Sequence, residues 1–191
     1  MAIRLDQLLR GFFPDLDPVR IKVHLAQFNG RERPLDVFRD GTFPEWQSYQ
    51  TRKNFPRDFV ISLIETETLD IWLFAGLWQR GGEPRWQPDM WAEARSHKRP
   101  DLWFYNLIAV PALEPFTGRL HVRFRKAARA SYRNFETILD EIDVSSLIDQ
   151  PRGLPRFAGY RNVHLEMPML RQLIDKVPED WRTALSSVAG I

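Results

Sequence analysis

The chain has 191 residues, of which 43% are hydrophobic and 27% charged, and it contains 14 prolines and 10 glycines. This composition excludes a disordered chain and is typical of a folded protein of one domain, or of one domain with a short appendage. The absence of cysteine excludes disulfides and thiol chemistry, and the four scattered histidines show no zinc-ligand spacing.

The net charge of +2 does not identify a partner. No apolar stretch approaches the roughly 18–20 residues that a membrane span needs. The first residues also lack the charged and then apolar order of a signal peptide. We therefore expect a cytoplasmic protein without a membrane partner.

Residues 1–13 predict a short helix, because Leu5, Leu8 and Leu9 share one stripe and Pro14 ends the pattern. The rest of the first half shows strand patterns and one further helix. In chain order, we expect a strand over 20–28, a helix over about 44–54, and a hairpin in the middle of a sheet from the apolar segments 58–65 and 70–79.

Residues 80–100 predict a long irregular connection, since they contain Gly81-Gly82 and three prolines, and loops of this length are commonly functional. The later patterns predict strands over 102–110 and 119–125, a helix from Ser131 to about Ile142, a loop over 153–159, a strand over 162–166, and helices over 169–176 and 178–188. Several strands interleaved with helices indicate an α+β fold, with a curved antiparallel or mixed β-sheet, or a partly closed barrel, and flanking helices.

The segment from Arg119 to Arg133 is the strongest candidate for a site. Its first half alternates apolar and basic residues, so a strand would direct the apolar side chains into the core and the cations to the other face. A helix that starts near Ser131 would add backbone N–H donors suited to phosphate. We expect a DNA phosphate-binding surface that consists of Arg119, Arg123, Arg125, Lys126, Arg129 and Arg133. The alternative is a solvated sheet face whose arginines pair with acids such as Asp140, Glu141 and Asp143.

A second candidate is the polar and aromatic segment over residues 46–55. Its amide and cationic side chains can read base edges or phosphates, and its aromatic rings could stack on bases. We expect base contacts or a pocket from Trp46, Gln47, Gln50, Lys53, Asn54 and Phe55. The alternative is that these aromatic residues belong to the core.

A third candidate is the aromatic strand that contains Trp72, Phe74 and Trp78, which fall on one face with Gly76 between them. A glycine in a strand marks a bulge or allows something to approach the backbone closely. The element is similar to barrel strands of PUA-like modified-base readers, which hold an extruded base between aromatic rings. We therefore add these three aromatic residues to the expected pocket, with core packing again as the alternative.

The last residues read Asp180-Trp181-Arg182-Thr183-Ala184-Leu185-Ser186-Ser187-Val188-Ala189-Gly190-Ile191. They resemble the segment that precedes the first motif of a GIY-YIG nuclease domain in bacterial proteins, where Gly-Ile/Val-Tyr follows. The resemblance begins at about Ile21, and it includes the Trp-Gln-x-x-Gln and Asn-Phe residues within 46–55 and the Trp-Leu-Phe-Ala-Gly residues at 72–76. The alternative for the tail is an amphipathic helix that ends at Gly190.

The resemblance implies that the chain is the N-terminal domain of a GIY-YIG nuclease family protein, with a role in restriction or defence. It divides the chain into a DNA-recognition domain over 1–177 and a linker helix with the start of the nuclease domain over 178–191. The motif tyrosines, the arginine and the metal-binding glutamate of such nucleases would lie beyond Ile191. We therefore expect no catalytic residue and no cofactor in this chain, and a divalent metal in the nuclease domain.

The expected function is to bind DNA and so to position or select the target of the nuclease, which includes sensing a modified base. An alternative is a protein-interaction or dimerisation module, for which the Trp-rich loop 80–103 would supply an apolar anchor. A homodimer would be the partner in that case. A third alternative is a free-standing enzyme, but the sequence contains no catalytic set of residues that would support it.

Overall fold

The structure, a computed structural model, describes residues 4–28, 30, 32–88, 101–126 and 130–147. The elements predicted after residue 150 lie outside the described residues. The same holds for the predicted domain boundary at residue 177 and for the terminal segment that resembles nuclease proteins. Within the described part, no helix is long and apolar enough to cross a membrane.

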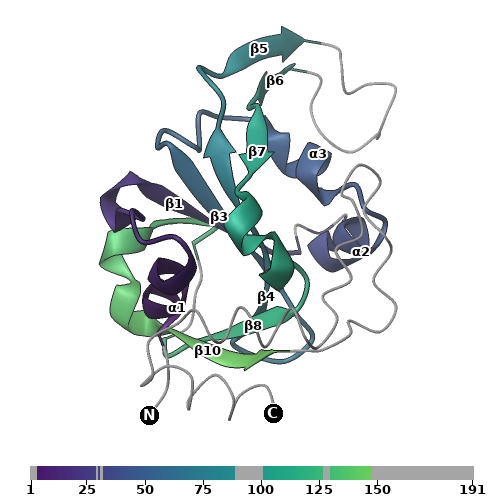
Figure 1. Cartoon of the computed structure of the whole chain (residues 1–191). Coiled ribbons are helices and arrows are strands. Elements are labelled where there is room, and N and C mark those ends of the chain that lie inside the picture. Colours follow the sequence, from purple (N-terminus) through teal and green to yellow (C-terminus); the bar gives the residue numbers. More distant parts are fainter. Residues whose placement is uncertain (1–3, 29, 31, 89–100, 127–129, 148–191) are drawn as a thin grey trace.

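The centre of the fold is a curved mixed sheet that forms a half-barrel (Figure 1). Among the described residues, seven strands build it in the order β10-β8-β4-β3-β1-β9, with β7 paired to β4. The pair of β1 and β3 is parallel, and the other pairs are antiparallel. The strands are β1 (Ile21–Ala26), β3 (Phe59–Glu65), β4 (Ile71–Arg80), β7 (Leu107–Ala109), β8 (Leu120–Phe124), β9 (Tyr132–Asn134) and β10 (Ile142–Leu147). The expected α+β fold is confirmed, as is the central hairpin of β3 and β4.

A smaller antiparallel sheet projects beyond the main one, next to β7 (Figure 1). In the described residues it consists of β2 (Tyr49–Gln50), β6 (Asp101–Phe104) and β5 (Arg85–Pro88), with β6 in the middle. The single strand predicted over 102–110 is therefore two strands in different sheets, with a break at Tyr105 and Asn106. The irregular connection predicted over 80–100 is partly wrong, because Arg80 ends β4 and Arg85–Pro88 form β5.

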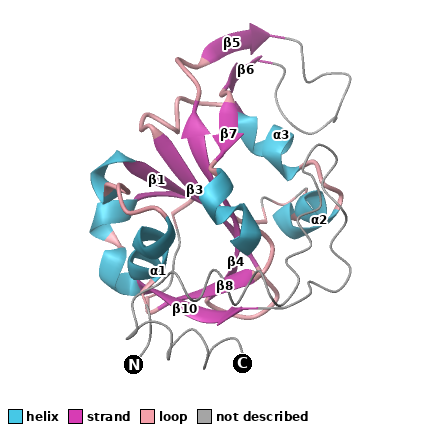
Figure 2. Cartoon of the chain, viewed as in Figure 1, coloured by secondary structure: helices cyan, strands magenta, loops and turns pink. Residues whose placement is uncertain are grey.

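Helices cover both faces of the main sheet (Figure 2). The predicted first helix is confirmed as α1 (Leu5–Phe12), which buries its leucines against one face. On the other face, α2 (Pro34–Arg39) and α3 (Phe43–Ser48) bury Phe38 and Trp46 with Ile64 of β3. The short 3-10 helices are η1 (Pro18–Arg20), η2 (Pro111–Phe116), η3 (Phe135–Thr137) and η4 (Leu139–Glu141).

Two helix predictions need correction. The helix predicted over 44–54 ends at Ser48, because the next two residues pair with β6. The helix predicted over 131–142 is wrong, since this segment forms β9 followed by η3 and η4. The open edge of β1 explains the second difference, because the main-chain N–H of Leu25 donates to the carbonyl oxygen of Ser131 at 2.8 Å. The apolar spacing that suggested a helix instead buries Phe135 and Ile138 in the core beside α1.

Candidate nucleic-acid interface

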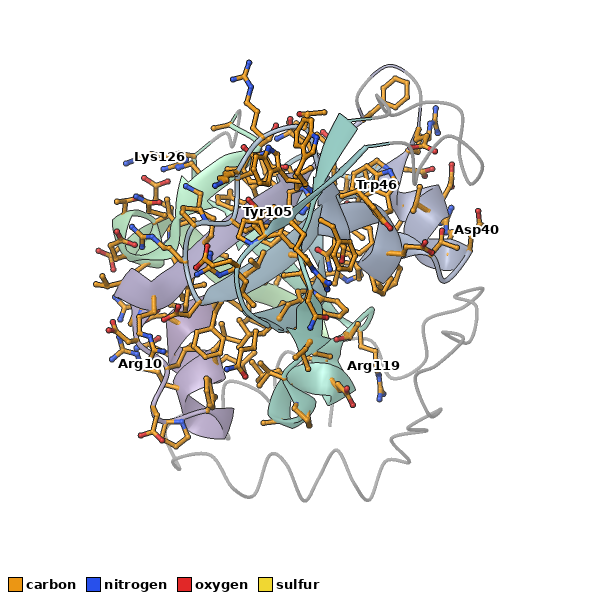
Figure 3. The ribbon with its side chains drawn as sticks, turned by 90° about the horizontal axis from the view of Figure 1, so that it is seen from above. Arg10, Asp40, Trp46, Tyr105, Arg119 and Lys126 are labelled. Atoms are coloured by element: carbon orange, nitrogen blue, oxygen red, sulfur yellow. The ribbon has the colours of Figure 1, made fainter. Side chains whose placement is uncertain are left out.

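Strand β8 has the predicted alternation, but its cations do not form one free surface. Leu120, Val122 and Phe124 are buried, as expected. Arg119 is also buried, with 8% of its surface exposed. It lies far from Lys126, which follows the other end of β8 (Figure 3). The two residues therefore do not belong to one phosphate-binding surface.

The cations that follow β8 are paired with acids. The Arg125 guanidinium donates to both carboxylate oxygens of Asp143, at 2.7 and 2.9 Å. These hydrogen bonds raise the pKa of Arg125. Lys126 and Arg133 both contact Glu141, at 3.3 and 3.4 Å. This is the arrangement that the alternative interpretation of the segment describes.

Two predicted phosphate ligands remain. Arg123 is exposed, and no acidic side chain in the described ranges forms an ion pair with it. Arg129 lies outside the described residues. The backbone donors of a helix at Ser131 do not exist, because β9 begins there instead. Phosphate binding at this surface stays a prediction, which the structure supports best for Arg123.

The three aromatic residues of β4 do not share a face, contrary to the prediction. Ser62 of β3 pairs with Gly76 and the next residue pairs with Phe74, so the strand has a bulge at this point. Trp72 and Phe74 pack in the core beside α1, whereas Trp78 packs in a separate cluster. All three side chains are at most 4% exposed. Of the two roles that the sequence left open for Gly76, the structure shows the bulge.

The segment 46–55 lies mostly inside the fold. Trp46 and Phe55 are buried, so the aromatic residues belong to the core, as the alternative stated. The indole Nε1 of Trp46 donates to Glu32 at 2.8 Å. The amides of Gln47 and Gln50 are buried too. Of the six predicted residues, Lys53 is the exposed one and Asn54 is half-buried.

A row of polar residues, which the sequence did not reveal, crosses the main sheet. Ser62 pairs with His24 on β1, and His24 pairs with Tyr132 on β9. The His24 and Tyr132 rings stack, with centroids 5.0 Å apart and 7° between their planes. The Ser62 hydroxyl donates to Oε1 of Gln47. These side chains form a buried polar row on the face that does not contact α1.

Gln50 joins this row to the smaller sheet. Its Nε2 donates to the main-chain oxygen of Gln47 at 2.6 Å. Its Oε1 accepts hydrogen bonds from the Tyr132 hydroxyl and from Nδ2 of Asn54, the latter at 3.2 Å. Burial raises the pKa of Tyr132 well above its usual value of 10, so the hydroxyl stays protonated and can donate.

The smaller sheet presents two tryptophans side by side. Trp86 on β5 lies opposite Trp103 on β6, and Trp103 lies opposite Gln50 on β2. Residues that oppose one another across strands share a face of the sheet. The two indole rings meet edge to face, with centroids 5.1 Å apart. Trp86 is 48% exposed, which is unusual for so large an apolar side chain.

Each face of the smaller sheet has one cation over an aromatic ring. The ammonium nitrogen of Lys53 lies 4.4 Å from the ring centroid of Trp103, a cation-π geometry. On the other face of the sheet, the guanidinium of Arg85 lies 5.9 Å from the ring centroid of Phe104. Both cations are exposed, and neither forms an ion pair with an acid in the described part of the chain. We call Lys53, Trp86 and Trp103 the tryptophan platform.

The platform has a rigid base. Trp103 packs against a buried cluster that contains Phe55, Trp78 and Tyr105. Tyr105 directs its ring into this cluster, where its centroid lies 5.1 Å from that of Phe55 (Figure 3). Trp103 is therefore the solvent-facing end of a core cluster, and Trp86 extends beyond it toward solvent.

The described residues also line a shallow cleft of about 260 Å³ between α2 and the turn after β3. Both cations and acids line it, and Arg39 donates to Asp36 at 3.3 Å. Such mixed charge does not favour an anionic ligand over other ligands. The tryptophan platform is the better candidate, because its cation, Lys53, has no acidic partner among the described residues.

Sequence reasoning placed Lys53, Gln50 and Asn54 in a site, and it named the Trp-rich loop as an anchor, but it did not connect them. The connecting signal was weak. Trp86 and Trp103 stand at the two ends of a proline-rich connection, which indicates that the connection could close as a hairpin. Nothing in the sequence indicated that such a hairpin would pair with residues 49–50.

In the part of the chain that the structure describes, no three His, Asp or Glu side chains come together as metal ligands. No protein-family model matches the chain, and no curated protein or solved structure matches it either. The resemblance to GIY-YIG nuclease proteins therefore rests on its motif residues alone.

Proposed function

We propose that the chain is a DNA-binding domain and that the tryptophan platform is its contact surface. The observation that carries this proposal is the pair Trp86 and Trp103, half exposed at its outer end and flanked by Lys53. Flat aromatic rings beside unpaired cations are typical of surfaces that stack bases and track phosphates.

The platform suits DNA better than the face of β8 does. A cation that already donates to a carboxylate must break that pair before it contacts a phosphate. Arg125 is held in this way by Asp143 through two hydrogen bonds. Lys53 and Arg85 lie over aromatic rings and are exposed, so they can contact phosphates without losing an ion pair.

The resemblance to GIY-YIG nuclease proteins supports the same function. A domain ahead of a nuclease would use DNA binding to position the target, and base contacts would make it selective. This part of the proposal rests on the motif residues within 46–55, 72–76 and 180–191. Recognition of a modified base would be one form of such selectivity.

The test is DNA binding by the purified chain, measured by fluorescence anisotropy of labelled oligonucleotides. Trp86→Ala should weaken binding by about 10-fold, since stacking contributes ~1–3 kcal/mol per base. Phe28→Ala is the matched control, because Phe28 is 55% exposed but lines the cleft beside α2. Equal binding by the two variants would contradict the platform as the DNA contact.

A second function has one observation in its favour. An exposed tryptophan on a short strand is also a typical anchor for a protein partner, and Trp86 could bind a second copy of the chain. Sedimentation at increasing protein concentration separates the two functions. A dimer that Trp86→Ala dissociates, together with no affinity for DNA, would favour the interaction module.

A further inference from the structure

We infer that the platform takes an unpaired base, in a single strand or turned out of a duplex, and that Asn54 accepts a hydrogen bond from an N–H group on the edge of that base. This inference rests on the proposed function and specifies its ligand. It follows from the ring surfaces, from the direction of the Asn54 amide and from the position of Lys53.

The first step concerns the rings. A base within an intact duplex has both of its faces covered by its neighbours, so an aromatic side chain can stack on it only if the base steps separate or the base leaves the helix. The indole of Trp86 offers one N–H donor and no acceptor, so it is poorly suited to read a groove edge by hydrogen bonding. A tryptophan pair with one exposed and one half-buried ring therefore fits a free base face better than an intact duplex.

The second step concerns the direction of the amides. A main-chain carbonyl can only accept, so the Gln50 atom that contacts the main-chain oxygen of Gln47 must be Nε2. The other Gln50 atom is then Oε1, an acceptor, and the Asn54 atom that faces it must be the donor Nδ2. The hydrogen bonds thus assign Nδ2 as the Asn54 amide atom that faces Gln50.

The third step follows from the second. With Nδ2 held by Gln50, the remaining polar atom of the Asn54 amide is its oxygen, Oδ1. No donor among the described residues forms a hydrogen bond with that oxygen. Asn54 is half-buried and adjoins Lys53 in the chain. Its hydrogen-bond partner Gln50 lies opposite Trp103 across the smaller sheet, so we place this acceptor beside the platform, where a base would satisfy it with an N–H group.

The fourth step adds the phosphate. Lys53 lies over Trp103, so a base that stacks on the platform would bring its own or a neighbouring phosphate near the ammonium group. The tryptophan rings match the face of an unpaired base, the Asn54 oxygen matches its edge, and Lys53 matches its phosphate. All four Watson–Crick edges carry at least one N–H donor, so the site would require an unpaired base without demanding one particular base.

The experiment compares four ligands of equal length by anisotropy with the full chain. They are a thymine single strand, a blunt duplex, the same duplex with one unpaired thymine, and a thymine strand methylated at N3, which lacks the N–H. We expect the single strand and the bulged duplex to bind at least about 10-fold more tightly than the blunt duplex. We also expect N3-methylation to weaken binding several-fold.

Two variants localise the effect. Trp86→Ala should remove most of the preference for unpaired DNA. Asn54→Ala should abolish the difference between thymine and N3-methylthymine while it retains the preference for single strands. Circular dichroism and thermal melting of each variant confirm that it is folded. Asn54 is half-buried and is not part of an apolar cluster, so this variant should fold.

The outcomes are separable. If no DNA binds, the proposed function fails. If the blunt duplex binds as tightly as the single strand, DNA binding stands and the inference about an unpaired base is overturned. If wild type does not distinguish N3-methylthymine from thymine, the role of Asn54 as acceptor is overturned.

Discussion

The indole ring of Trp78 occupies the space where a side chain of Gly76 would lie. A Cβ atom at Gly76 would be 3.0 Å from Cε2 and Cζ2 of Trp78, closer than nine in ten such contacts. Gly76 also has a φ of 133°, in the region that favours glycine. Glycine at position 76 therefore allows both the backbone conformation of the bulge in β4 and the position of the Trp78 ring.

Gly76→Ala should lower the free energy of unfolding by about 1–3 kcal/mol, because it strains the backbone and displaces Trp78. Urea unfolding followed by tryptophan fluorescence measures the change. Gly82→Ala separates the two causes, since Gly82 has a φ of 86° but nothing within 4 Å of its Cβ position. If both variants lose the same stability, the contact with Trp78 contributes nothing.

Trp78→Ala should lower the free energy of unfolding by about 3–5 kcal/mol, as expected for a buried aromatic residue. Trp78 is 2% exposed and packs with Phe55 and Tyr105. Trp86→Ala should cost less than about 1 kcal/mol, because half of that side chain is already in water. A small loss for Trp78→Ala, with reduced DNA affinity, would restore the ligand-pocket interpretation of Trp78.

The salt dependence of DNA binding should distinguish the two basic surfaces. Each phosphate contact on a single strand adds about 0.7 to the slope of log K against log salt concentration. We expect Lys53→Ala to flatten the slope by about 0.7. The pair Arg123→Ala and Arg125→Ala should change it less, because Arg125 is engaged by Asp143. The reverse order of effects would place the phosphates on β8.

Acid should weaken the link between Arg57 and Glu136. Two hydrogen bonds from Arg57, at 2.5 and 2.8 Å, hold the pKa of Glu136 below its ordinary value of 4.5. A carboxylate with a lowered pKa stabilises the fold above pH 4.5, and this stability is lost as the pH falls through the folded-state pKa. The free energy of unfolding should therefore decrease below pH 4.5.

Glu136→Gln should flatten that part of the pH profile and cost about 1 kcal/mol at pH 7, since the pair is partly screened by solvent. Glu83→Gln is the control, because Glu83 is 85% exposed and lies 3.5 Å from Arg80. Chemical unfolding at several pH values measures both variants. An unchanged acid limb in Glu136→Gln would assign the loss of stability to other carboxylates.

Sequence patterns by themselves determined the elements whose character is local. The leucine stripe predicted α1, and the apolar runs on either side of an acidic turn predicted the hairpin of β3 and β4. The alternation in β8 predicted that Leu120, Val122 and Phe124 are buried. These predictions hold because the period of the apolar side chains selects both the element and its inward face.

Tertiary structure alone decided which groups are available for function. Whether Arg125 is free depends on β10, which brings Asp143 beside β8 although it is distant in sequence. The same residues that suit a helix became β9, because the edge of β1 offers hydrogen-bond partners that periodicity does not reveal. A single bulged residue moved Trp78 to the other face. The tryptophan platform exists because β5 and β6 pair, and strand pairing depends on long-range register rather than on any local pattern.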